Sequence, residues 1–180
     1  MNERETKTKG QKPKTQIATI IIVLILIPLA YLVFSGALWI FDYGHSGVHW
    51  SFYCESNMSG LGRAMLIYAN DNNDKYPTAD NWCDVLIEYN PDNKEKSFKC
   101  KGAGKGRCNF AINPMAEPNS LPDIVLLFES QPGWNQHGGP EILTTENHKG
   151  KGCNILFNGG HVVFVKPEEL GELNWGNEKE

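Results

Sequence analysis

Five cysteines, Cys54, Cys83, Cys100, Cys108 and Cys153, are the side chains in this 180-residue chain best suited to cross-linking or metal binding. Because the number is odd, at least one thiol is unpaired or pairs with another chain. Cys100 and Cys108 enclose a short glycine-rich loop, so we expect a disulfide between them. Zinc is the alternative, but zinc-binding cysteines are usually separated by about two to four residues. We therefore predict a disulfide and no metal.

The chain also contains five histidines: His45, His49, His137, His148 and His161. Only His148 and His161 stand near predicted strands. One hypothesis is that these two, together with Glu129, bind a metal ion or serve a hydrolase. A general base needs a nucleophile or substrate beside it, and no Ser or Cys stands in a recognisable nucleophile motif. We favour the other interpretation, in which each imidazole bonds backbone groups at a turn, and we predict neither enzymatic activity nor a cofactor.

The polar run Asn70–Asp74 carries oxygen atoms in a pattern that invites comparison with a calcium-binding loop. An EF-hand would place Gly where Lys75 stands and Glu where Asn81 stands. Short polar side chains compete with a helix for backbone hydrogen bonds. We therefore predict that a helix ends here, with Asn72 or Asn73 in the left-handed conformation.

Residues 17–41, IATIIIVLILIPLAYLVFSGALWIF, contain no charged side chain. At ~1.5 Å per residue this stretch forms a helix of roughly 37 Å, enough to cross a hydrocarbon core of ~30 Å. A cleaved signal peptide is the alternative, but its apolar core is usually only about 7–15 residues long. We predict an uncleaved transmembrane helix in contact with the lipid bilayer.

Charge is distributed unevenly along the chain. Residues 1–16 carry a net charge of +3, whereas residues 42–180 carry 12 basic and 19 acidic groups. A basic segment before the membrane helix predicts a cytoplasmic N-terminus and an extracytoplasmic domain, where a disulfide would persist. Nucleic acid is excluded as a partner, because phosphate binding needs a basic surface.

Helical periodicity begins after residues 42–53, which we interpret as a connector between the membrane and the domain. Four apolar residues then recur at helical spacing: Met58, Leu61, Met65 and Tyr68. A second helix is expected over residues 81–89, because Asn90-Pro91 follows its apolar stripe.

Short apolar runs predict the strands. One is expected near 109–112, and the run DIVLLFE at 123–129 reads as a strand buried on both faces. Residues 153–157 and 161–165 flank Asn158-Gly159-Gly160, a strong hairpin signal. Two helices followed by three or four strands predict an α+β fold, with a helix packed on a small antiparallel sheet. We place the domain at 54–166 and an acidic tail at 167–180.

Several segments, taken together, are similar to a known bacterial group. ESNMSGLGRAMLIYANDNNDKYP resembles the helix that follows the membrane segment in type II secretion pseudopilins. WCDVLIEY, FKC…CNFAINP, DIVLLFES and HKGKGCNILFNGGHVVFV resemble, in order, later segments of the prepilin-type processing-associated family named for a His, nine residues and Asp-Gly. His148, Asn158 and Gly159 occupy that motif, with Asn in place of Asp.

This resemblance implies a pseudopilin-like domain held outside the cytoplasm by a single membrane helix. It further implies a structural or protein-binding role in type II secretion or pilus-like machinery, with other pilin-like proteins as partners. Gly10 is followed by Gln11, not by the usual Phe-Thr-Leu-Ile-Glu, and the apolar stretch contains no Glu. Fold and placement therefore carry over more strongly than filament assembly. The alternative function remains a metal-dependent domain or hydrolase using His148 and His161.

Overall fold

The computed structural model describes residues 13–89 and 95–176, with side chains at all of these except 13–22 and 36–50. The chain divides into two compact units, Met1–Gly44 and His45–Glu180. Within these described ranges, four short 3-10 helices accompany the α-helices and strands: η1 Glu95–Phe98, η2 Pro140–Ile142, η3 Glu146–His148 and η4 Pro167–Glu172.

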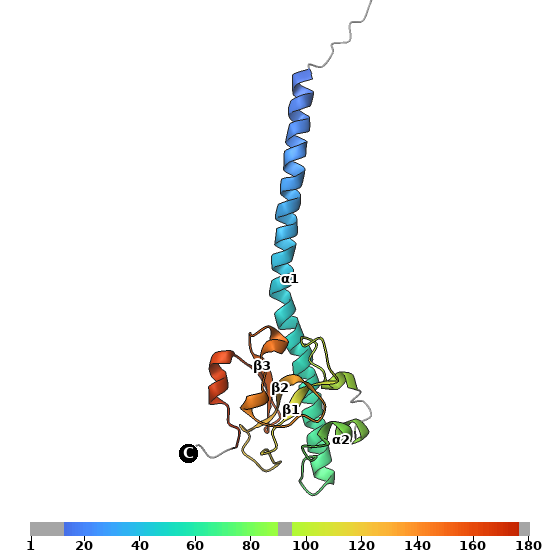
Figure 1. The fold of residues 1–180 in the computed structure, drawn as a ribbon, viewed down its shortest axis with the longest axis vertical. Helices are drawn as coiled ribbons and strands as arrows, with labels where there is room; N and C mark the ends of the chain where they lie inside the picture. Colours follow the sequence, from blue (N-terminus) through green and yellow to red (C-terminus); the bar gives the residue numbers. More distant parts are fainter. Residues whose placement is uncertain (1–12, 90–94, 177–180) are drawn as a thin grey trace, which may run out of the picture. The chain divides into compact units, whose positions relative to one another are not determined.

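Helix α1 spans Pro13–Asp71, a length of 59 residues (Figure 1). Residues 42–53, predicted to connect the membrane segment to the domain, are helical and belong to α1. Glycine lowers helix propensity by about 1 kcal/mol per residue. Helix formation is nevertheless cooperative, and strong helix-forming segments on both sides carry the helix through Gly44 and Gly47.

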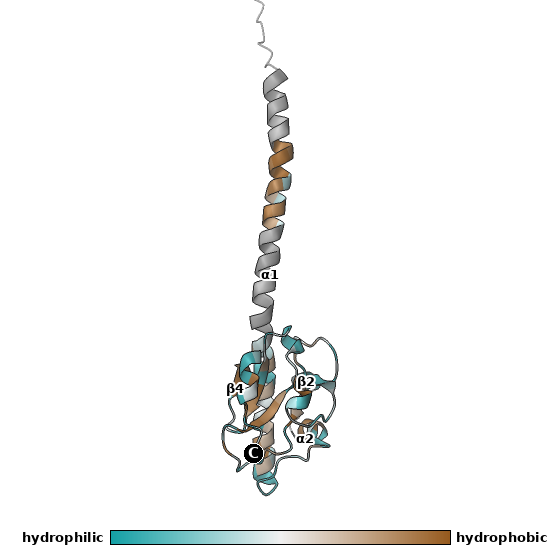
Figure 2. Ribbon diagram, turned by 60° about the vertical axis from the view of Figure 1, so that its left-hand side comes forward, coloured by the Kyte–Doolittle hydropathy of each residue, from teal (hydrophilic) through white to brown (hydrophobic). Residues whose placement is uncertain are grey.

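In the described part of the predicted membrane segment, residues 23–35, the large apolar side chains are exposed, from 46% for Val23 to 71% for Tyr31. The ribbon of this part is coloured mostly as hydrophobic in Figure 2. Within the part of the chain whose side chains the structure describes, no helix is both long and apolar enough to cross a membrane. The side chains of residues 17–22 and 36–41 lie outside that described set, as do residues 1–12 of the predicted cytoplasmic segment. The transmembrane assignment thus stays a prediction.

Four strands form one antiparallel sheet in the order β1-β2-β3-β4. They are β1 Cys108–Ile112, β2 Val125–Gly133, β3 Cys153–Phe157 and β4 Val162–Val165. Residues 125–130 of β2 are buried throughout, as predicted for a strand covered on both faces. The predicted α+β class, with helices on a small antiparallel sheet, is confirmed.

The C-terminal part of α1 covers one face of this sheet (Figure 1). Met58, Leu61 and Met65 are fully buried there, whereas Tyr68 is half-buried. Gly62 permits the close approach of helix and sheet, because a Cβ at this position would lie 2.6 Å from a Leu156 methyl carbon. Helix α2 (Trp82–Tyr89), predicted over nearly the same residues, adds the fully buried side chains of Trp82 and Leu86 to this core.

The last part of the chain covers the opposite face of the sheet. Leu170, Leu173 and Trp175 pack against a second cluster that includes Phe128, and the Phe128 and Trp175 rings lie 4.9 Å apart. The predicted acidic tail at 167–180 therefore contributes apolar side chains to this packing. The acidic side chains of this segment stay exposed while its apolar ones are buried in part. Residues 177–180 lie outside the described range.

The predicted end of the first helix is confirmed. Helix α1 ends at Asp71, the Asn72 side chain donates to the Tyr68 carbonyl at 2.8 Å, and Asn73 is left-handed with φ 56°. The polar run thus acts as a helix terminus.

Candidate functional site

A cluster of four buried side chains is the strongest candidate for a site. One potential ligand atom from each of Cys54, Cys100, Glu129 and His148 lies within 4.8 Å of the others. All four residues are at most 4% exposed. Sulfur, imidazole nitrogen and carboxylate oxygen are the donor types that bind divalent transition metals in proteins.

Each member of the cluster comes from a different element. Cys54 lies in α1, Cys100 follows η1, Glu129 lies in β2 and His148 ends η3. The left-handed Lys149, with φ 58°, ends the η3 turn directly after His148. The site therefore exists only once helix, loop and sheet have packed together.

A disulfide joins Cys54 to Cys100, with Cα atoms 4.8 Å apart and a sequence separation of 46. The predicted Cys100–Cys108 pair is thus wrong. Cys108 begins β1, which turns its thiol into the interior, where it donates to the Phe110 carbonyl at 3.2 Å. Cys83, Cys108 and Cys153 are free and buried, which agrees with the expectation of at least one unpaired thiol.

Glu129 and His148 form the polar centre of the cluster. His148 Nε2 lies 2.9 Å from Glu129 Oε1, and the Asn154 side-chain amide donates to the same oxygen at 2.7 Å. Glu129 Oε2 and His148 Nδ1 are buried and have no hydrogen-bond partner among the described residues. A buried carboxylate is costly unless charge or hydrogen bonds compensate it, so this centre is only partly satisfied.

The three histidines whose side chains the structure describes lie in different environments. His137 Nδ1 lies 3.2 Å from the Asn135 carbonyl, as predicted for a histidine at a turn. His148 instead bonds a buried side chain, so that prediction is wrong for it. His161 is exposed and stacks on Phe157 at 4.9 Å; it is not part of the cluster that contains His148. The side chains of His45 and His49 lie outside the described set.

Two of the free thiols are held in their protonated form. Burial, reinforced by the nearby charge of Glu129, raises the pKa of Cys153 to about 12. Burial and the neighbouring Cys108 also raise the pKa of Cys83. Because the thiolate is the reactive species, neither Cys153 nor Cys83 is a nucleophile near neutral pH.

The two ends of the family motif do not meet. His148 precedes β3 and Asn158 follows it, and the strand between them is about 13 Å long at ~3.3 Å per residue. Asn158 accepts from the Tyr76 hydroxyl at 2.9 Å and donates to the Ser120 carbonyl at 2.9 Å. Burial raises the pKa of Tyr76 to about 12, which keeps this donor protonated. The motif residues anchor opposite ends of one strand.

The turn after β3 contains Asn158, Gly159 and Gly160. Gly160 adopts the positive φ, at 84°, whereas Asn158 does not. The Asn158 backbone instead donates to the Ile124 carbonyl at 2.8 Å. Its side chain ties the turn to the rest of the domain.

Changing Asn158 to Asp, the residue of the family motif, should destabilise this protein. The carboxylate would face the Ser120 carbonyl with no amide hydrogen to donate, which should lower the free energy of unfolding by ~1–3 kcal/mol. Urea unfolding of the full chain in detergent measures this. Asn119→Asp, at an exposed position, is the matched control and should change stability by less than about 0.5 kcal/mol. Equal effects of both changes would contradict the assigned role.

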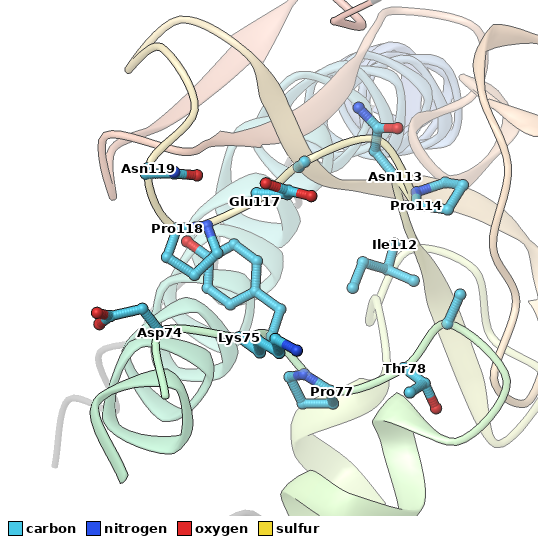
Figure 3. Close-up of a pocket in the computed structure, with 13 residues that line it drawn as sticks. Asp74, Lys75, Pro77, Thr78, Ile112, Asn113, Pro114, Glu117, Pro118 and Asn119 are labelled. Carbon is cyan, nitrogen blue, oxygen red and sulfur yellow. The ribbon is translucent and has the colours of Figure 1, made fainter. Parts of the chain in front are cut away.

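A surface pocket of about 310 Å³ lies apart from this cluster (Figure 3). The loop at 74–79 and the loop at 113–119 form its walls. Asp74, Lys75 and Glu117 are its charged residues, and neither Cys nor His is among its lining residues. The pocket therefore lacks the donor set found in the buried cluster.

Sequence reasoning named Glu129 and His148 but missed Cys54 and Asn154 as members of the site. A signal was available for Asn154, since it is a polar residue inside an apolar strand. Cys54 offered none, because its partners lie 46 to 94 residues further along the chain.

Comparisons of this chain with protein-family models, with curated proteins and with solved structures found no match. The functional argument therefore depends on the residues and geometry described above. Their main feature is a donor cluster enclosed in the interior, at the junction of helix and sheet.

Replacing His148 with Ala should lower the free energy of unfolding by ~2–3 kcal/mol, because Glu129 then keeps only its bonds to Asn154. Urea unfolding with the disulfide intact measures this loss. His161→Ala removes an exposed imidazole and should change stability by less than about 0.5 kcal/mol. If the two variants unfold at the same urea concentration, the buried contact contributes nothing measurable.

Proposed function

We propose that this protein is a single-pass membrane-anchored, pseudopilin-like protein with a structural or protein-binding role outside the cytoplasm. One observation carries the proposal. The same unbroken helix, α1, contains the uncharged stretch 17–41 and the face of Met58, Leu61 and Met65 that packs on the sheet. This succession of apolar stretch and core-forming helix is what the resemblance to pseudopilins leads one to expect.

The disulfide and the charge distribution support the proposed placement. Disulfides such as Cys54–Cys100 persist mainly in oxidising compartments. The basic residues precede the apolar stretch, and the domain after it is acidic, which favours a cytoplasmic N-terminus. Both features are expected of a domain exported across the membrane.

The enclosed cluster supports a binding or structural role over catalysis. Its four ligand residues are at most 4% exposed, so a substrate has no direct access to them. Association with type II secretion or pilus-like machinery is the narrower part of the proposal, and it relies on the segment resemblance. In-cell cross-linking should yield adducts with pilin-like proteins; anchored chain without such adducts would overturn this narrower part alone.

Membrane extraction tests the anchor. After alkaline carbonate treatment, the full chain should remain in the membrane pellet, whereas an Ile25→Asp/Leu29→Asp double variant should be released because charge is costly in the hydrocarbon core. The matched control is Leu66→Asp, an exposed position of the same helix outside the apolar stretch. It should stay in the pellet. Release of the unmodified chain would overturn the proposal.

Protease added to intact spheroplasts tests the placement. It should degrade the domain while a cytoplasmic marker protein survives. A domain that resists external protease, but is cut after the spheroplasts are lysed, would place it on the cytoplasmic side and overturn the proposal.

A further inference from the structure

We propose that Cys54, Cys100, Glu129 and His148 form a structural zinc-type metal site when the two cysteines are in their dithiol form. The inference does not rest on the proposed function. The disulfide and the metal ion would then be alternative cross-links at one position in the fold.

The donor geometry supports the assignment. A tetrahedral zinc ion with Zn–S of ~2.3 Å and Zn–N or Zn–O of ~2.0–2.1 Å separates its donors by about 3.3–3.8 Å. Cys100 Sγ lies 3.5 Å from His148 Nε2, and all four potential ligand atoms lie within 4.8 Å of one another. Small side-chain movements after the sulfur–sulfur bond opens are therefore sufficient to surround an ion.

An unpartnered oxygen at the polar centre of the cluster supports the proposed metal site independently. Glu129 is fully buried, and its Oε2 accepts no hydrogen bond from the described residues. Oε1 is already held by the Asn154 amide at 2.7 Å. This leaves Oε2 as the ligand atom and Asn154 as the group that orients the carboxylate, the outer-shell arrangement common at metal sites. A divalent cation would also compensate the buried negative charge.

A dithiol reductant transfers two electrons and two protons to the Cys54–Cys100 disulfide, giving two thiols while the reductant becomes a disulfide. Binding of the cation then releases both thiol protons to solvent. Two thiolates, one carboxylate and a neutral imidazole complete four ligands, so no open position remains for a substrate. Sites closed in this way are structural.

Cobalt(II) provides the test, because tetrahedral thiolate coordination gives it characteristic charge-transfer and visible absorption bands. The full chain in detergent is reduced with a dithiol, freed of reductant without oxygen, and titrated with cobalt. We expect one cobalt per chain with these bands, displaced by zinc, and their loss when the disulfide is closed. Failure of the reduced chain to bind cobalt, or identical bands in both redox forms, would overturn the proposal.

Variants assign the ligands. Glu129→Gln and His148→Ala should weaken cobalt binding by at least ~10–100-fold, the range already found for outer-shell changes. The matched controls His161→Ala and Cys153→Ala should retain the affinity and the spectrum, because neither residue belongs to the cluster. Undiminished binding in Glu129→Gln would show that Glu129 is not a ligand and would overturn the proposed four-residue site. If His148→Ala does not fold, Glu129→Gln and the redox dependence of the unmodified chain still decide.

Discussion

Replacing Leu61 with Asp should unfold the domain, lowering the free energy of unfolding by more than ~4 kcal/mol. Leu61 is fully buried on the face of α1 that packs on the sheet. The change removes a large apolar side chain, which by itself is worth about 2–5 kcal/mol. It also introduces a carboxylate with no partner, and burying such a group adds further to the loss.

Leu66→Asp is the matched control, because it makes the same change on the same helix where the side chain is 43% exposed. It should alter stability by less than about 0.5 kcal/mol. Thermal unfolding of the detergent-solubilised chain, followed by near-ultraviolet circular dichroism, measures both. Equal midpoints for Leu61→Asp and the unmodified chain would refute the packing of this helix face.

Loss of the Cys54–Cys100 cross-link is the second large effect. For a sequence separation of 46 residues, the chain-entropy model predicts destabilisation by ~4 kcal/mol, because the unfolded chain gains conformations when the loop opens. The Cys54→Ala/Cys100→Ala variant should therefore unfold at a much lower urea concentration. A chelator in the buffer keeps bound metal from contributing.

Cys153→Ala is the control for losing a buried sulfur without losing a cross-link. It should cost about 1 kcal/mol, the usual size of a single-residue effect. If the double variant were no less stable than Cys153→Ala, the cross-link would contribute nothing. Zinc added to the reduced, otherwise unmodified chain should recover stability, whereas the double variant should not respond, which connects this measurement to the proposed metal site.

The disulfide joins helix α1 to the loop after η1, whereas the proposed metal ion would join both of these to β2 and η3 as well. In the disulfide form, the Glu129–His148 contact at 2.9 Å forms the polar centre of the domain. The packing of Met58, Leu61 and Met65 on the sheet does not depend on whether the disulfide or the metal ion is present. We therefore expect Leu61→Asp to destabilise the domain more than loss of the disulfide does.

Sequence patterns were sufficient to predict those elements that depend on residues close together in the chain. The stripe of α2, the buried run of β2, the hairpin of β3 and β4 and the polar end of α1 all follow from periodicity and turn chemistry within about ten residues. The course of α1 through 42–53 was missed, since cooperative helix extension outweighed the low propensity of its glycines.

Only tertiary packing decided the disulfide partner, the covering of the second sheet face and the site. Cys100 lies eight residues from Cys108 but bonds Cys54, because β1 and α1 fix where each sulfur points. Glu129 and His148 stand 19 residues apart and meet through the return of the chain beside β2. Such contacts depend on which surfaces pack together, and residue spacing along the chain carries no direct record of that choice.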